Sequence, residues 1–432
     1  MSALPKTTAH GCGSAHGLLD VASAQARIRA RVSRMPHERV PLDLAEDRVL
    51  AAAVDSAVDL PPFDNSAMDG YAMRWHAALR EGSVLDVSAE QAAGAGVSCL
   101  ATGAVAIMTG ARMPDGADTV VPVEQTHVLQ RDDDGRPRRI RIEVAPVCGQ
   151  HVRRAGEDIA RGARAVEAGV RLDAGACMLL RGAGIATVDV AHRPRAALLC
   201  TGRELIDIAG SALAPGQIHN TNGPYLRSRL CSAGADIAHV ATLADDASLF
   251  VDEVRDCLAR GVDLVISTGA VSMGRYDFVP DALDALGADI VFHKLAMRPG
   301  KPLLFAMLPG GVPFFGLPGN PVSSAVGMRF FVECALRAML GMAPETPWRL
   351  PLADAVAKKT GFHLFQKAGL QLDAHGRVAV RPLKGQESFR TRPLLQARVW
   401  AGLPADATTL PAGHLVDVHP LGHFDHDFFA RL

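Results

Sequence analysis

Between residues 195 and 345, short apolar runs alternate with longer segments that have helical spacing. Ala196–Cys200 and Asp263–Ser267 have the composition of buried strands, and Ser248–Arg260 places apolar side chains at i, i+4 and i+8. Val322–Leu340 is predicted to be a long amphipathic helix. Because strand–helix alternation of this kind packs as a parallel sheet covered by helices, it predicts a three-layer α/β/α domain with a mostly parallel sheet.

The segments on either side of this region have a different pattern. Residues 80–150 hold short alternating runs between Gly, Pro and Asp clusters, which is typical of a small β domain. Residues 346–432 have the same character and indicate a small β barrel or sandwich. Residues 18–35 have helical spacing, and 1–17 indicate a flexible tail. A chain of 432 residues is therefore expected to contain about three or four domains.

The composition of the chain indicates in which cellular compartment the protein works and which kinds of partner it is expected to bind. The 45 basic and 46 acidic side chains nearly cancel, so electrostatics favours neither nucleic acid nor a membrane as a partner. The eight cysteines stand singly, which is typical of thiols in a reducing compartment. His10, Cys12 and His16 are interpreted as part of the tail rather than as a metal site. With no apolar run near the roughly 20 residues of a membrane helix and no signal-peptide core, we expect a cytoplasmic protein.

Five loops are predicted at the carboxyl ends of the strands, the edge at which open α/β sheets bind ligands. They lie at 201–204, 244–246, 268–274, 297–302 and 317–321. Their glycines allow backbone N–H groups to approach a phosphate, and a proline in the first turn of a helix leaves its N-terminus open toward an anion. Each loop alone could be a plain turn, and none has the GK[ST] of a P-loop. Five at one edge predict a phosphate-binding cleft.

Charged side chains in and beside these loops suggest two kinds of ligand group. The cations would donate to oxyanions, although solvated surface charge is the alternative interpretation; they are Lys294, Arg298 and Lys301. The carboxylates would hold Mg²⁺, with the choice between the two adjacent aspartates left open; they are Glu204, Asp245, Asp246 and Asp277.

Long sequence blocks resemble the molybdopterin molybdenumtransferases, the molybdenum insertase family that includes the E domain of gephyrin. The blocks are PPFDNSAMDGYAM (61–73), IMTGARMPDGADTVVPVE (107–124), RRAGEDI (153–159), TGREL (201–205), TGAVSMGRYDF (268–278), HKLAMRPGKP (293–302) and GLPGNPVSS (316–324). Together they extend the resemblance over nearly the whole chain, from about residue 18 to 420. The FDNSAMDGYA block followed by PGKP and LPGNP is highly specific for this family.

The resemblance implies a multidomain α/β plus β architecture around a molybdopterin-binding α/β/α domain. The implied parts are a flexible tail at 1–17, an elongated N-terminal domain formed by 18–62 plus 151–190, a β-rich inserted domain at 63–150, the α/β domain at 191–345 and a C-terminal β barrel at 346–432. It also implies a homodimer, in which the cleft lies between the α/β domain of one subunit and loops of the other.

The activity implied by the resemblance is transfer of molybdenum from molybdate to adenylylated molybdopterin, with release of AMP and with Mg²⁺ as cofactor. A molybdopterin adenylyltransferase would supply the substrate, and molybdoenzymes or their chaperones would accept the product. The implied catalytic residues are Asp69, Asp158, Glu204 and Asp277. The implied cofactor-binding residues are Thr109, Thr201, Gly202, Thr268, Gly269, Ser272, Gly274, Lys294, Arg298, Pro299, Gly300, Lys301, Pro318, Gly319, Asn320, Pro321, Lys367 and Ser388.

Two departures from the family pattern bear on turnover. Ala270 stands where the family usually has a second glycine after Thr268, and Arg203 stands where an aspartate is common. Both leave open a non-catalytic molybdopterin-binding or scaffolding paralogue of the same fold. A second alternative is a nucleotide-processing hydrolase that shares the α/β domain, which the FDNSAMDGYA and RRAGEDI blocks disfavour.

Overall fold

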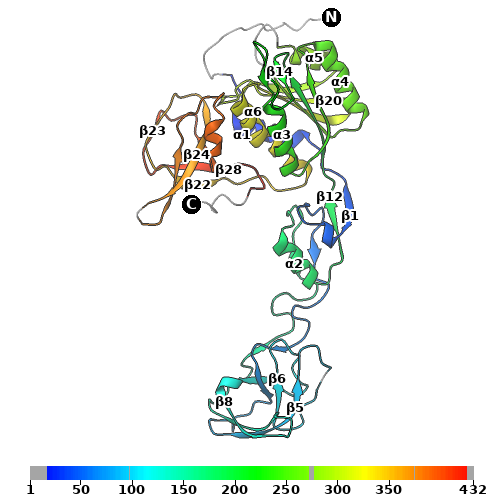
Figure 1. Ribbon diagram of the computed structural model, residues 1–432, viewed down its shortest axis with the longest axis vertical. Helices are drawn as coiled ribbons and strands as arrows, with labels where there is room; N and C mark the ends of the chain where they lie inside the picture. Colours follow the sequence, from blue (N-terminus) through cyan, green and yellow to red (C-terminus); the bar gives the residue numbers. More distant parts are fainter. Residues whose placement is uncertain (1–16, 97, 272–276, 374, 426–432) are drawn as a thin grey trace, which may run out of the picture. The chain divides into compact units, whose positions relative to one another are not determined.

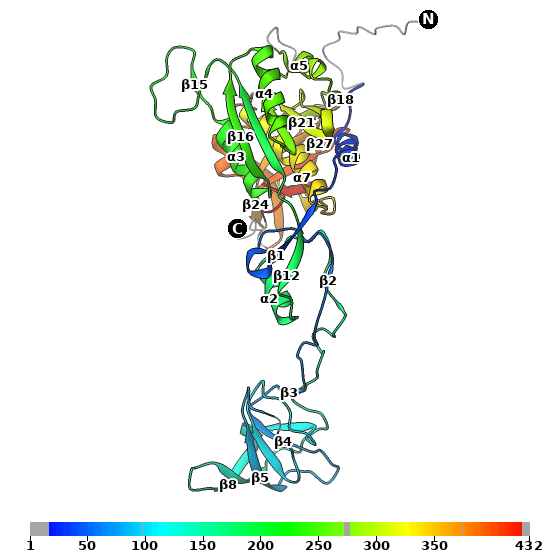
Figure 2. The same cartoon turned by 90° about the vertical axis from the view of Figure 1, so that its right-hand side faces the viewer.

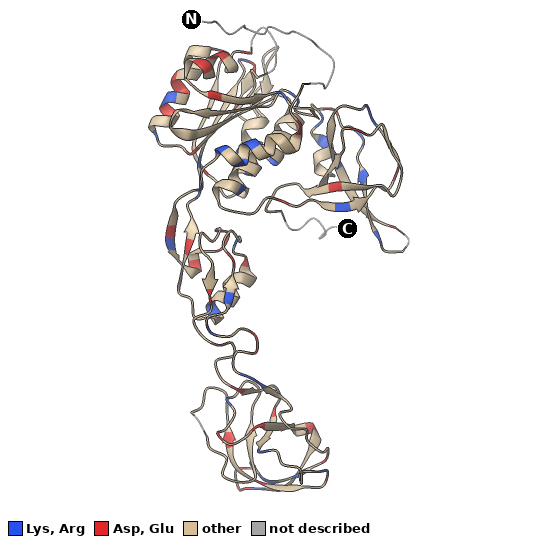
Figure 3. Ribbon diagram, turned by 180° about the vertical axis from the view of Figure 1, so that it is seen from behind, with Lys and Arg blue, Asp and Glu red and all other residues tan. Residues whose placement is uncertain are grey.

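The computed structural model describes residues 17–96, 98–271, 277–373 and 375–425, which form two compact units (Figure 1). The inserted unit is Arg39–Val190, and the main unit consists of the chain up to Glu38 together with the chain from Ala191 onward. Basic and acidic residues occur in both units (Figure 3), in nearly equal numbers over the whole chain. Among the described helices, none has the length and apolarity needed to cross a bilayer.

The main unit is built around a six-stranded sheet in the order β16-β13-β17-β21-β20-β18. Its strands are β13 (Arg195–Thr201), β16 (Asp236–Leu243), β17 (Leu264–Thr268), β18 (Asp289–His293), β20 (Leu304–Leu308) and β21 (Val312–Leu317). The first four strands in this order are parallel, while β20 runs antiparallel to both of its neighbours. The predicted, mostly parallel sheet is therefore confirmed.

Helices cover both faces of this sheet, because successive side chains of each strand point to opposite faces. The helices are α1 (Val21–Arg31), α3 (Asn222–Ser232), α4 (Ala247–Ala259), α5 (Val279–Ala285) and α6 (Pro321–Gly327) (Figure 1). Along β13, Ala197 and Leu199 pack into the core formed with α4 and α5. Leu198 and Cys200 pack into the core formed with α1, α3 and α6. These two cores confirm the three-layer α/β/α architecture.

The long helix after β21 differs from its prediction. It consists of α6, a π-helical turn at Met328–Val332 and α7 (Glu333–Met339). The expected amphipathic character is wrong, because every residue from 322 to 333 is buried. The sheet covers one side of the helix, while α1 and the aromatic residues Phe365 and Trp400 of the C-terminal strands cover the other. A helix packed on all sides has no polar face to present to solvent.

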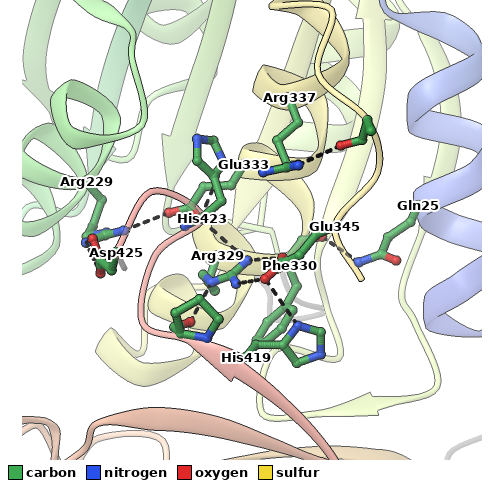
Figure 4. A network of polar contacts seen from close by, with 12 residues as sticks. Gln25, Arg229, Arg329, Phe330, Glu333, Arg337, Glu345, His419, His423 and Asp425 are labelled. Carbon is green, nitrogen blue, oxygen red and sulfur yellow. Dashed lines mark hydrogen bonds and ion pairs between the residues drawn. The ribbon is translucent and has the colours of Figure 1, made fainter. Parts of the chain in front are cut away.

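A network of buried charges lies on this long helix (Figure 4). Arg329 and Glu333 are one turn apart, and each has less than 3% of its surface exposed. Arg329 donates two hydrogen bonds to the carboxylate of Glu345, at 2.5 and 2.8 Å. Glu333 accepts from Arg229 at 3.1 Å and from the backbone N–H of His423 at 2.8 Å. The network thus links the helix to α3, to the chain that follows the helix and to the C-terminal segment.

The C-terminal strands form a closed β structure. Its strands are β22 (Trp348–Pro351), β24 (His363–Leu372), β25 (Val378–Pro382), β26 (Val399–Leu403) and β28 (Leu415–Pro420). They pair in the order β24-β26-β28-β22, and β25 pairs with the other side of β24. A bridge between Leu352 and Val380 joins the β22 end to β25 and closes the ring. The short strand β19 (Met297–Arg298) adds to β24, so the loop at 297–302 lies beside this barrel.

The inserted unit contains a second six-stranded sheet, in the order β7-β4-β6-β5-β9-β8. Its strands are β4 (Gly70–Met73), β5 (Val84–Gln91), β6 (Ala104–Ile107), β7 (Thr119–Pro122), β8 (Thr126–Arg131) and β9 (Pro137–Ile142). The predicted small β domain is therefore confirmed as part of the fold, while its bounds at 80–150 stay a prediction. The same unit contains the helix α2 (Ala174–Gly182) and the paired short strands β2 (Val54–Asp55) and β11 (Arg164–Val166).

The core of the main unit includes the N-terminal helix, since Ala24 and Ile28 of α1 are wholly buried in it. The chain up to Glu38 accordingly groups with the main unit rather than with the residues that follow it. The exact bounds expected for the individual domains stay predictions. The tail predicted at 1–17 lies almost entirely outside the described residues.

Candidate functional site

A cavity of about 920 Å³ opens at the carboxyl ends of β13, β17 and β21. This is the edge at which the sequence predicted a phosphate-binding cleft. The predicted residues in its lining are Thr201, Gly202, Glu204, Asp245, Thr268, Gly269, Asp277, Pro318, Gly319, Asn320 and Pro321. Four of the five predicted loops therefore contribute to one cavity, and the fifth touches it through Pro302.

Hydroxyl groups hold the strand ends of this cavity together. Thr201 donates its hydroxyl to the carbonyl of Thr268 at 3.2 Å, and Thr268 donates to the carbonyl of Pro318 at 3.3 Å. A Cβ at Gly269 would lie 2.5 Å from the Thr201 hydroxyl oxygen, and the φ of Gly269 is 101°. Only glycine allows so close an approach in that conformation. These residues shape the cavity wall and leave backbone groups to face a ligand.

Ala270, the residue that replaces the usual glycine, lines the cavity with a φ of 51°. A non-glycine residue in this left-handed region costs about 1–2 kcal/mol, because its Cβ crowds the following carbonyl. We therefore expect Ala270→Gly to raise the free energy of unfolding by about 1 kcal/mol, as measured by chemical denaturation. Ala26→Gly, at an exposed position within α1, should lower it by a similar amount. Destabilisation by Ala270→Gly would contradict the strain assigned to this position.

The structure gives different surroundings to Asp245 and Asp246, the two adjacent aspartates between which the sequence did not choose a Mg²⁺ ligand. Asp246 is the N-cap of α4, and its carboxylate accepts from the backbone N–H groups of Ser248 and Leu249 at 2.8 and 3.1 Å. Asp245 instead lines the cavity. Its carboxylate lies 3.7 Å from the Nε of Arg203, so the unusual arginine partly neutralises one of the cavity's acidic groups.

The carboxylates of the cavity are spread out. Within the described part of the chain, Glu204, Asp245 and Asp277 do not converge as three ligands around one point. Mg²⁺ commonly takes one or two protein carboxylates and completes its shell with water and substrate phosphates. The donor set is therefore compatible with an ion that arrives with a nucleotide and unlike a closed protein cage.

A second cavity, of about 370 Å³, lies beside the first and shares Pro302 with it. Its cationic residues are Arg298 and Lys301, which carry the charge of the MRPGKP loop. The Arg298 guanidinium lies 4.3 Å from the centre of the Phe362 ring, which holds it in place. The remaining polar lining comes from Ser323, Gln366, Gln386 and Ser388, while Pro299 and Gly300 form the backbone of the loop.

Two of the predicted cations do not line either cavity. The wholly buried Lys367 donates its Nζ to the carbonyls of Gly385 and Arg390, at 2.7 and 3.0 Å. Burial lowers the pKa of this amine. Lys367 therefore holds the loop that carries Ser388 to the smaller cavity and Phe389 to the larger one. Lys294 has a φ of 74° at the end of β18, and its backbone N–H bonds the carbonyl of Leu303.

Three predicted residues belong to the inserted unit. Asp69 accepts from the backbone N–H of Thr109 at 2.7 Å and from its hydroxyl at 3.0 Å. These two bonds, the backbone one first, lower the pKa of Asp69. The backbone N–H of Asp158 bonds the carbonyl of Leu60 at 2.9 Å. Ser272 and Gly274, also predicted, lie outside the described residues.

Several lining residues were missed by the sequence reasoning. Asn222, in the first turn of α3, donates to the Thr268 hydroxyl at 3.0 Å and to the Gly319 carbonyl at 2.7 Å. Gln366 lines the smaller cavity. Its side-chain oxygen Oε1 is buried and has no hydrogen-bond partner among the described residues. The asparagines of the HNTNGP segment, at the start of α3, were a signal for Asn222. A glutamine within a β-strand carries no such signal.

The three-layer α/β/α domain with a polar cavity at the carboxyl ends of its parallel strands belongs to the class of open α/β folds whose ligands bind at this edge of the sheet. Three family models match this chain. They are the MoeA N-terminal region (domains I and II) at residues 19–184, a probable molybdopterin binding domain at 197–338 and the MoeA C-terminal region (domain IV) at 349–421.

The chain is also similar to curated proteins over most of its length. It is 38% identical to the molybdopterin molybdenumtransferase of Synechococcus elongatus, over 94% of this chain and 100% of that protein. It is 34% identical to molybdopterin molybdenumtransferase 2 of Mycobacterium tuberculosis, over 88% of this chain and 94% of that protein. The molybdopterin biosynthesis MoeA protein of Pyrococcus horikoshii has a similar crystal structure, with a TM-score of 0.77 and 26% identity over 93% of this chain and 100% of that chain.

The chain therefore belongs to the molybdopterin molybdenumtransferase (MoeA) family. It is an enzyme of the transferase class that acts in molybdenum cofactor biosynthesis. The family, the fold class and the enzyme class predicted from the sequence blocks are all confirmed.

Proposed function

We propose that this protein transfers molybdenum from molybdate to adenylylated molybdopterin and releases AMP together with molybdenum cofactor. The observation that carries this proposal is the pair of adjoining cavities that share Pro302. The larger one has the size and the strand-end backbone groups suited to a nucleotide-linked pterin. The smaller one presents Arg298, Lys301 and Ser388 to an oxyanion. A ligand in each would place phosphate and molybdate next to each other.

In this proposal the protein positions the two substrates, while the pterin dithiolene binds the metal. Carboxylates at the rim of the larger cavity, Glu204 and Asp277, would hold Mg²⁺ against the nucleotide phosphates. Bound there, Mg²⁺ would neutralise phosphate charge and stabilise the leaving AMP. Thr201, Thr268 and Asn222 would keep the strand-end loops in a fixed geometry around the ligand.

The proposal is tested by complementation in a bacterial strain that lacks its own molybdenumtransferase, scored by molybdoenzyme activity at micromolar molybdate. With purified protein and adenylylated molybdopterin, AMP release should accompany molybdenum incorporation. A folded, soluble protein that restores no molybdoenzyme activity would support the scaffolding alternative, for which Arg203 and Ala270 are the motivating residues. Retention of the Glu204 and Asp277 carboxylates in the lining favours turnover.

Removal of the Lys301 ammonium should weaken molybdate binding. A charge-assisted hydrogen bond to an oxyanion contributes about 1.5–3 kcal/mol, so Lys301→Ala should raise the dissociation constant for molybdate by roughly ten- to a hundredfold. Titration calorimetry with molybdate and with AMP measures this directly. Lys384→Ala, at a site outside both of these cavities, serves as the control. Equal molybdate affinity in wild type and Lys301→Ala would show that the loop at 297–302 has a structural role and does not bind molybdate through Lys301.

We further propose a homodimer in which Asp69, Thr109 and Asp158 of one subunit complete the cleft of the other. Mixing inactive Asp69→Asn subunits with inactive Asp277→Asn subunits should then restore part of the activity, because one cleft of each mixed dimer would carry neither substitution. Activity after mixing, followed at a fixed total protein concentration, measures the effect. A monomer by mass measurement at the assay concentration would refute the arrangement.

The proposed partners follow from the reaction. The substrate would be delivered by a molybdopterin adenylyltransferase, since a nucleotide-linked pterin must be formed before it can be used. The product would pass to molybdoenzymes or their chaperones. We propose that these exchanges take place in the cytoplasm, with neither nucleic acid nor membrane as a partner.

A further inference from the structure

A cluster of metal-ligating side chains lies away from both cavities, at the edge of the α/β sheet. His239 is in β16, which is the edge strand (Figure 2), and Glu253 and Cys257 are on α4, which packs against that strand. Positions i and i+4 lie on one face of a helix, so α4 presents both of its residues in the same direction. The three ligand atoms lie within 4.8 Å of one another, the one such group of three among the described residues.

We propose that His239, Glu253 and Cys257 form a binding site for a divalent ion of the zinc class. Imidazole nitrogen, carboxylate oxygen and thiolate sulfur are the donors that zinc takes, and three protein ligands leave the fourth tetrahedral position to water. The side chains of His239 and Glu253 are 18% and 24% exposed, so water can reach that position. The site is independent of the proposed molybdenum transfer.

The spacing of the donors suits a tetrahedral ion after small side-chain movements. With bond lengths of about 2.0–2.3 Å, donor atoms around zinc lie roughly 3.3–3.6 Å apart. His239 Nε2 and Glu253 Oε1 are now 2.5 Å apart and would open by about 1 Å. The Cys257 sulfur lies within 4.8 Å of one ligand atom of each of these residues and would move closer by at most a similar distance.

Without a metal, the proposed ligand atoms of His239, Glu253 and Cys257 share or carry hydrogen atoms. The short contact between His239 Nε2 and Glu253 Oε1 is a hydrogen bond, and one proton lies between them. Cys257 is wholly buried beside Phe250 and Val254, and this burial raises the pKa of its thiol to about 11. Binding of the ion would replace the thiol proton of Cys257, and the ring proton of His239 would move from Nε2 to Nδ1.

Arg260 competes with the ion. Its Nη1 lies 3.4 Å from His239 Nδ1, where a guanidinium can only donate. When Nε2 binds a metal, Nδ1 carries the ring proton, so two donors would face each other. The Arg260 side chain is exposed and can turn away, at a cost in affinity. Removing this guanidinium should therefore tighten metal binding, an effect that a nonspecific surface site would not show.

Because of the position of the cluster, a bound ion would connect the strand β16 to the helix α4. The three-residue connection between β16 and α4, at 244–246, carries Asp245 into the larger cavity. An ion bound by His239 before this connection and by Glu253 after it would clamp the strand to the helix. Binding to the folded state alone would also raise the melting temperature, by an amount that grows with the logarithm of the metal concentration above the dissociation constant.

The test uses the full-length protein, stripped of metal by a chelator under reducing conditions and titrated with Co²⁺ as the probe. One equivalent of Co²⁺ should produce a thiolate-to-cobalt charge-transfer absorption, and Zn²⁺ should displace it. Cys257→Ser should lose this absorption, while Cys231→Ser, at an exposed cysteine of α3, should keep it. Cys12→Ser should also keep it, which separates this site from the His10, Cys12 and His16 sequence.

Two substitutions of polar residues test the site without touching the core. Glu253→Gln should weaken Zn²⁺ binding by about tenfold or more, and Arg260→Ala should strengthen it. The proposal is overturned if the wild type shows no thiolate-to-cobalt absorption, or if that absorption persists in Cys257→Ser. If Cys257→Ser fails to fold, unchanged Zn²⁺ affinity in both Glu253→Gln and Arg260→Ala overturns it as well.

Discussion

Asp277→Asn is expected to reduce molybdenum transfer by about a hundredfold or more, in line with the loss of one preorganised charged contact in an active site. The carboxylate lines the larger cavity just ahead of α5, where the proposed nucleotide or its Mg²⁺ would meet it. Asparagine keeps the shape and removes the charge. Because a loop carboxylate contributes little to the core, the melting temperature should change by only a few degrees. Molybdenum incorporation at saturating molybdate measures the effect.

Asp246→Asn is the matched control for this substitution. It also replaces a loop aspartate next to the cavity, but Asp246 caps α4, and asparagine caps helices equally well. Transfer and stability should both remain close to wild type. Comparable loss of transfer in the two variants would mean that general disturbance of the loops, rather than the Asp277 charge, limits the reaction.

The second large effect concerns stability. Arg329→Met removes the cation that lies between Glu345 and Glu333 (Figure 4). Glu345 then loses its closest neutralising partner, and Glu333 keeps Arg229 but loses its second cation. Burial already raises the pKa of Glu333, against the opposing effect of Arg329 and Arg229. Breaking a buried ion pair by removing one partner costs about 3–5 kcal/mol. Chemical denaturation should therefore show a loss of that size in the unfolding transition of the main unit.

Arg255→Met is the control for the buried pair. Arg255 forms an ion pair with Asp252 on the exposed face of α4, at 3.3 Å, and both side chains are more than half exposed. Exposed pairs of this kind contribute about 0–1 kcal/mol. If Arg329→Met were as stable as Arg255→Met, apolar packing against Phe330 and its neighbours would have replaced the ionic network without loss.

The sequence by itself determined the class of fold and the location of the site. Alternating apolar strands and helices between residues 195 and 345 require a mostly parallel sheet with helices on both faces, because each strand must bury both of its faces. Loops rich in glycine and proline then fall at one edge of that sheet. This local chemistry, together with the specific blocks such as LPGNP, was enough to predict the larger cavity and the family.

Tertiary structure alone decided how individual side chains are used. Asp245 and Asp246 are neighbours in the chain, but the start of α4 turns one into a helix cap and the other toward the cavity. Lys367 has the charge of an anion-binding residue, yet the barrel buries its amine against two carbonyl groups. The direction of a side chain depends on packing partners that are distant in sequence. For the same reason, the long helix is buried on all sides over residues 322–333, and His239 meets Cys257 only because β16 and α4 pack together.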